Sequence, residues 1–167
     1  MMQVNFPVIL LTALIPMLVG ALWYHPAVFG KIWMRESGLS EEALKKGNMI
    51  LIFGVAFLFS FLIAFSMQFM VIHQWHLYSI VANEAYIDGA NGSAAKWLED
   101  AMKLYGENFR TFKHGAFHGT LVGFLTATPL IGVLALFERK SFKYIFIHGI
   151  YWTFCAALMG GVICAFS

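Results

Sequence analysis

Residues 49–72 read MILIFGVAFLFSFLIAFSMQFMVI, a stretch of 24 residues without a charged side chain. A helix needs about 20 residues to cross the roughly 30 Å hydrocarbon core of a bilayer, so this stretch is long enough to span a membrane. Its apolar residues are consecutive, as in residues 61–65 (FLIAF), and do not alternate with polar ones as they would in a membrane β-strand. The stretch therefore predicts a transmembrane helix.

Three further apolar runs lie at residues 6–24, 115–137 and 142–165, and apart from Lys143 they also lack charged residues. The four runs fill more than half of the 167 residues, and 60% of the chain is hydrophobic while 12% is charged. A soluble domain of this size would have too little polar surface to cover so much apolar material. We therefore expect an all-α membrane protein with four transmembrane helices in a single domain, residues 1–167, surrounded by lipid. The net charge of +2 is small and scattered, so nucleic acid is not expected as a partner.

The long loop between the second and third runs contains an amphipathic pattern after Ser93. Apolar residues recur there at helical spacing and charged residues occupy the opposite face. The apolar positions are Trp97, Leu98, Ala101, Leu104 and Tyr105. We expect a helix that lies flat across the end of the bundle or among the lipid headgroups, and a docking surface for a partner is the alternative.

The basic residues predict the orientation of the bundle. Seven of the eleven Lys and Arg residues lie in the first and third loops or at the adjoining edge of the fourth run, at Lys31, Arg35, Lys45, Lys46, Arg139, Lys140 and Lys143. By the positive-inside rule these two loops face the cytoplasm. Both termini and the long second loop are then predicted to face the periplasm or the exterior.

Small residues repeat at four-residue intervals in each predicted span, and such stripes let membrane helices approach closely. The strongest stripe is Gly115, Gly119, Gly123 and Ala127 in the third span, and the second span carries Ala56, Ser60 and Ala64. We interpret these stripes, which form a glycine zipper in the third span, as contact faces between helices of one chain. Self-association of two chains through the third span is the alternative.

Four histidines lie at the same predicted end of the bundle. His73 and His76 follow the second span, and His114 and His118 open the third, each pair at a spacing that shares one helix face. Imidazoles from two facing helices could hold a divalent metal, or a haem through one histidine from each helix. The alternative is that these histidines bind headgroups, water or backbone carbonyls, so no cofactor is the expected state.

No acidic or basic residue lies in the middle of a span, and no hydrolase or phosphate-binding motif occurs. We therefore expect a protein that is not an enzyme.

Two stretches support a resemblance to a known family. Residues 20–34 (GALWYHPAVFGKIWM) resemble the opening signature of the bacterial domain-of-unknown-function family 1761. Residues 137–141 (FERKS) and 149–160 are similar to the last two helices of that family. The resemblance implies a small four-helix protein of the bacterial inner membrane. It implies no activity and no catalytic residues.

The sequence leaves three functions open. The first is an accessory or assembly subunit of a membrane complex, or a homo-oligomer, which works by helix packing. The second is a metal- or haem-binding module that uses the four histidines. The third is a permease for small solutes.

Overall fold

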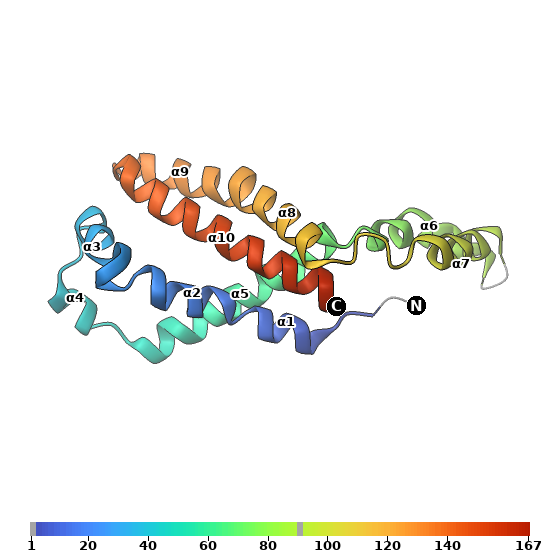
Figure 1. Ribbon diagram of the computed structural model, residues 1–167, viewed down its shortest axis with the longest axis horizontal. Helices are drawn as coiled ribbons and strands as arrows, with labels where there is room; N and C mark the ends of the chain where they lie inside the picture. The colour runs from blue at the N-terminus through green and yellow to red at the C-terminus, as the bar shows by residue number, and fades with distance from the viewer. Residues whose placement is uncertain (1–2, 90–91) are drawn as a thin grey trace.

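A computed structural model describes residues 3–89 and 92–167, and the regular structure in this part of the chain is helical. Four helical segments are long and apolar enough to cross a membrane, which confirms the predicted all-α fold with four spans (Figure 1). These segments are Phe6–Trp23, Met49–Val71, Phe112–Phe137 and Phe142–Phe166.

Two of the spans are continuous helices and two are interrupted. The continuous ones are α5 (Met49–Val71) and α10 (Phe142–Phe166). The first span consists of α1 (Phe6–Thr12) and α2 (Ile15–Trp23). The third consists of α8 (Phe112–Val122), the π-helical turn η2 (Gly123–Ala127) and α9 (Thr128–Phe137). The connecting elements are η1 (Pro26–Gly30), α3 (Lys31–Ser37), α4 (Glu41–Lys45), α6 (Gln74–Asp88) and α7 (Ser93–Tyr105).

A short polar side chain begins each span. The first backbone N–H groups of a helix lack partners within the helix, and a capping side chain satisfies one of them. The side chains of Asn5, Asn48, Thr111 and Ser141 each accept a hydrogen bond from the backbone N–H three residues later. The four spans therefore begin where the sequence supplies a cap in front of an apolar run.

Prolines account for both interruptions, because proline cannot donate a backbone hydrogen bond. Pro16 lies in the first turn of α2, and its carbonyl accepts a hydrogen bond from the Tyr151 hydroxyl at 2.6 Å. Pro129 follows η2, where the Thr128 hydroxyl lies 3.0 Å from the carbonyl oxygen of Gly123. Side-chain hydroxyls thus bind carbonyls beside the interrupted backbone.

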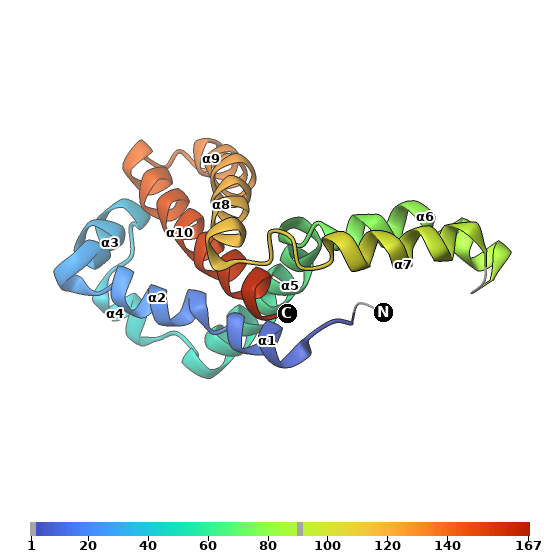
Figure 2. The ribbon, with the colours of Figure 1, turned by 45° about the vertical axis from the view of Figure 1, so that its right-hand side comes forward.

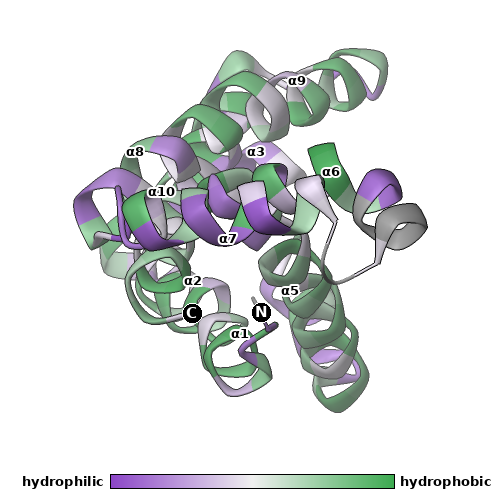
Figure 3. Cartoon of the chain, turned by 90° about the vertical axis from the view of Figure 1, so that its right-hand side faces the viewer, coloured by the Kyte–Doolittle hydropathy of each residue, from purple (hydrophilic) through white to green (hydrophobic). Residues whose placement is uncertain are grey.

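Helix α10 is the centre of the bundle. Half of the residues in its most apolar 18-residue stretch are buried, against 11–22% in the other three spans. Helix α10 also contacts elements of all three. The core joins Ile9 of α1 and Met67 of α5 to Met159 and Ile163 of α10, all nearly inaccessible to solvent. Most exposed large side chains of the spans are apolar, as contact with lipid requires. The span helices are accordingly coloured mainly as hydrophobic in Figure 3.

The two ends of the bundle differ. At one end lie both chain termini and the helical hairpin of α6 and α7, and we call it the hairpin end (Figures 1 and 2). The opposite end, here the loop end, holds α3, α4 and the turn between α9 and α10 (Figure 1). The predicted first and third loops therefore share one end, and the second loop shares the other with the termini.

The prediction that an amphipathic helix lies flat across the bundle end is wrong. Helix α7 instead packs against α6, and the two extend away from the bundle (Figure 2). The chain resumes as a helix directly after α5, so α7 has a neighbouring helix to cover part of its apolar face. The sequence did not indicate α6, because residues 74–88 lack an apolar stripe of helical period.

Candidate metal centre

The break between α5 and α6 supplies the first histidine of the site, His73. Helix α5 ends at Val71, and Ile72 adopts an extended conformation with φ −108° and ψ 100°. The Ile72 side chain is 1% exposed, so packing holds the break in place. His73 follows directly at the surface and precedes the first turn of α6.

The first two turns of α8 supply the other two histidines, His114 and His118. The Thr111 side chain caps this helix by accepting from the backbone N–H of His114 at 3.2 Å. Gly115 and Gly119 press against α10, and His114 and His118 each precede one of these glycines. One residue corresponds to a rotation of about 100° around a helix, so the two histidines share a face beside the α10 contact. That face meets His73.

Three imidazoles converge at this point. Nε2 of His73 lies 2.8 Å from Nε2 of His114, which is a hydrogen-bond distance. The ring centroid of His118 lies 4.9 Å from that of His73 and 4.5 Å from that of His114. One nitrogen from each of the three residues fits within a mutual distance of 4.8 Å. The site is therefore a compact group of three nitrogen donors at the hairpin end.

The three donors fit a small metal ion. With metal–nitrogen bonds of about 2.0–2.1 Å in a tetrahedral site, two ligand nitrogens lie about 3.3 Å apart. The closest pair here must open slightly and the widest must close, which rotation of the imidazole side chains can supply. A haem fits less well, because a porphyrin must lie between its two axial nitrogens and the closest pair is already in contact.

Phe109 covers the group from the loop before α8. Its ring stacks on the His114 ring with centroids 4.9 Å apart and meets the His73 ring edge-on at 6.2 Å. Its backbone has φ +63°, which is uncommon for a residue with a side chain, and its carbonyl accepts from the Cys164 thiol at 3.3 Å. The sequence did not indicate this role, because it depends on that backbone conformation.

The electrostatic surroundings favour neutral imidazole. Partial burial lowers the pKa of His73, and the neighbouring His114 and His76 side chains lower it further. Metal ligation requires an unprotonated nitrogen, so this environment prepares His73 for an ion near neutral pH.

The structure brings together three of the four histidines predicted from the sequence. His76 lies on α6, exposed, and does not belong to the group of three. The two remaining histidines belong to the loop end. His25 is the N-cap residue before η1, and Nδ1 of His148 lies 2.8 Å from the Tyr24 hydroxyl.

The small-residue stripes lie at contacts within the chain. A Cβ atom at Gly115, Gly119 or Gly123 would overlap the backbone of α10, so these glycines are where the two helices touch. Ala127 is half-buried. On α5, Ser60 and Ala64 are buried and Ala56 is half-buried.

The comparisons with known proteins identify a family. Residues 7–164 match the family described as "Protein of unknown function (DUF1761)". The chain belongs to this family. The match covers nearly the whole chain and confirms the resemblance seen in the sequence, and the family description names no activity. Neither the curated proteins nor the solved structures contained a match.

Proposed function

We propose that this protein is a membrane protein that binds a divalent transition-metal ion at its hairpin end, without catalysing a reaction. The observation that carries the proposal is the convergence of His73, which follows the second span, with His114 and His118 at the start of the third. Such convergence brings together donors that are 41 residues apart in the sequence. A neutral three-imidazole set suits Zn²⁺, Cu²⁺, Ni²⁺ or Co²⁺ and does not suit Mg²⁺ or Ca²⁺, which prefer oxygen ligands.

Zn²⁺ is the ion we expect to bind. Three histidines and one further ligand form a common tetrahedral zinc site, and the fourth position is open to water or to a ligand from outside. Under the predicted orientation, the site faces the periplasm of a bacterial inner membrane. The protein would there receive or hold the ion on the outer side of the membrane.

Calorimetric titration of the detergent-purified protein with Zn²⁺ tests the proposal, using an affinity tag without histidines. We expect one ion per chain. Replacing a protein group that merely supports a ligand already costs about 10–100-fold in affinity, so His114→Ala and His118→Ala should each cost about 100-fold or more. His76→Ala is the matched control and should change the affinity little, because His76 lies outside the group. Equal affinity in all four proteins would reject the proposal.

A second function, an accessory subunit with a membrane-protein partner, is favoured by the α6–α7 hairpin. The hairpin leaves the bundle and exposes large apolar side chains, including Ile80 at 67% and Leu104 at 69%. Apolar groups at such positions can form the contact with a partner. The glycine stripe of α8 supports self-association less than the sequence alone suggested, since α10 already occupies it. The permease alternative stays a prediction that flux measurements on liposomes would test.

A further inference from the structure

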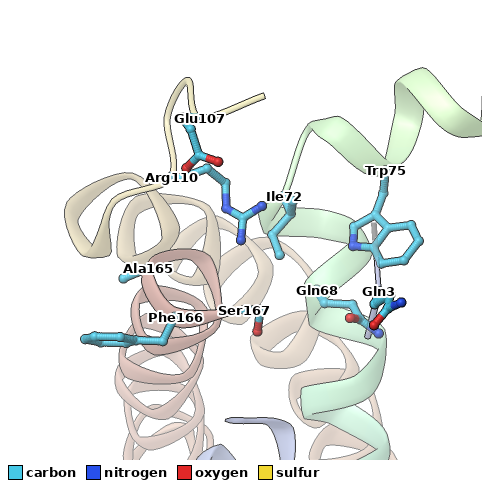
Figure 4. Close-up of a pocket in the computed structure, with 9 residues that line it drawn as sticks. All are labelled: Gln3, Gln68, Ile72, Trp75, Glu107, Arg110, Ala165, Phe166 and Ser167. Carbon is cyan, nitrogen blue, oxygen red and sulfur yellow. The ribbon is translucent and has the colours of Figure 1, made fainter. Parts of the chain in front are cut away.

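A polar cavity of about 530 Å³ lies at the hairpin end, and its lining residue Ile72 directly precedes His73 (Figure 4). Four parts of the chain line it, and the first of them is Gln3, which precedes α1. Gln68 and Trp75 come from the two sides of the α5–α6 break, Arg110 comes from the loop before α8, and Ser167 follows the last turn of α10. The cavity is large enough for a small molecule or a lipid headgroup.

Three buried polar atoms of this cavity lack a partner, and one of them is the Ser167 hydroxyl oxygen, which can donate or accept. Gln68 is 1% exposed, and its Nε2 atom has no hydrogen-bond partner in the described part of the chain. The same holds for the indole Nε1 of Trp75. Native proteins satisfy almost all buried polar groups, so an unpaired amide and an unpaired indole at one cavity indicate that something else accepts their hydrogen bonds. Both groups are N–H donors, so the missing partner is an acceptor.

Arg110 adds a positive charge to the same cavity. Its Nε donates to the carbonyl oxygen of Cys164 at 3.2 Å, which holds the guanidinium at the end of α10. Among the described residues the ion pairs join Arg35 to Glu36 and Lys103 to Glu99, so no carboxylate lies within ion-pair distance of Arg110. Glu107 also lines the cavity but forms no ion pair with it (Figure 4).

The position of Arg110 is fixed from a second side. Gln74 is 4% exposed, and its Nε2 donates to the carbonyl oxygens of Tyr105 and Asn108, both at 2.9 Å. These bonds anchor the loop before α8 to the start of α6. The backbone that leads to Arg110 is therefore held against α6, and the bond from its Nε to Cys164 holds the side chain.

We propose that this cavity binds a phosphate group, with Arg110 as its cation and the Gln68 amide and Trp75 indole as hydrogen-bond donors. A guanidinium matches phosphate oxygens in charge and in geometry. The cavity lies at the end of α5, with Gln68 in its last turn and Ile72 and Trp75 just beyond it, and hence near the depth of lipid headgroups. The phosphate comes either from a phospholipid headgroup or from a soluble phosphate compound. The three groups proposed to bind phosphate are not among the proposed metal ligands His73, His114 and His118.

Two binding measurements on the full-length, delipidated protein in neutral detergent distinguish the sources, both with a chelator present to exclude metal effects. In one, sodium phosphate is added against sodium chloride of matched ionic strength and the melting temperature is recorded. In the other, native mass spectrometry counts bound phosphatidylglycerol and phosphatidylcholine. Binding in the first identifies a soluble phosphate compound, and binding only in the second identifies a lipid headgroup.

Variants link the binding to the cavity. Arg110→Gln should weaken it by about tenfold, the usual effect of losing a charged hydrogen bond. Gln68→Met should weaken it by about fivefold and leave the ligand-free melting temperature unchanged or higher, because it removes an unpaired buried donor. Lys113→Gln, an exposed cation outside the cavity, is the matched control and should bind as the unaltered protein does. Absence of binding in both measurements, or equal binding by all four proteins, would overturn the proposal.

Discussion

Helix α8 approaches α10 closely because glycines at the contact have no side chain, and even one added methyl group would overlap the facing backbone. The backbones touch at Gly115 and Gly119 of α8 and at Gly160 and Ala156 of α10. In a membrane, helix association depends on such close packing, because lipid chains compete for apolar surface as well as any side chain does. The same contact sets the position of His114 and His118, so the packing and the metal centre are linked at the level of single residues.

Gly119→Ala tests this contact. The added methyl group would overlap the carbonyl oxygen of Ala156, so we expect a loss of about 2 kcal/mol in the free energy of unfolding and a lower melting temperature. Gly54→Ala is the control, because Gly54 lies in α5 with open space around its Cα. It should be neutral or slightly stabilising, since alanine favours helix more than glycine does. Equal melting temperatures for the two variants would contradict the packing described here.

The histidine group could be predicted from the sequence only in part. The spacing of His114 and His118 places both on one helix face, and the span ends place His73 at the same end of the bundle. Whether His73 or His76 meets them depends on the extended conformation of Ile72. Phe109 was missed for a similar reason, because a positive φ in a loop has no signature in residue type.

At the scale of elements, hydropathy predicts the four spans because long apolar helices are the simplest way to cross a bilayer. The interruption at Pro16 follows from proline chemistry as well. Helix α6 could not be predicted in this way, since its apolar and polar residues show no net periodicity. Its direction, away from the bundle, depends on pairing with α7.

The α6–α7 hairpin should be separable from the bundle. We expect that replacing residues 79–101 with a short Gly-Ser connection leaves the melting temperature and Zn²⁺ affinity almost unchanged. The reason is that Gln74, Tyr105 and Asn108, which anchor the hairpin base, are retained. If the accessory function holds, the same variant loses a partner that co-purifies with the unaltered protein. A variant that unfolds would show that the hairpin is part of the bundle's core.

At the scale of the whole molecule, the first and third loops lie at one end of the bundle and the second loop lies at the other. The seven basic residues of the first and third loops gather at the loop end, and the termini, the hairpin and both proposed sites lie at the other. Hydropathy and loop charge predict this arrangement. The phosphate cavity could not be predicted, because it combines residues from four separate parts of the chain.

Single cysteines test the orientation. Lys96→Cys lies on the hairpin and Lys45→Cys on α4 at the loop end. In intact cells, a maleimide that cannot cross membranes should label Lys96→Cys and spare Lys45→Cys, because the positive-inside rule places the loop end in the cytoplasm. The native Cys155 and Cys164 are buried and should give little background. The reverse labelling pattern would place the proposed metal centre in the cytoplasm.

X-ray absorption at the zinc edge of the Zn²⁺-loaded protein tests the central claim most directly, since it reports the ligands of the bound ion. We predict a four-coordinate ion with three imidazole nitrogens at about 2.0 Å and one further ligand such as water, and a loss of imidazole scattering in His114→Ala. A spectrum without imidazole scattering, or a protein that retains no zinc, would contradict the assignment of His73, His114 and His118 as a metal centre.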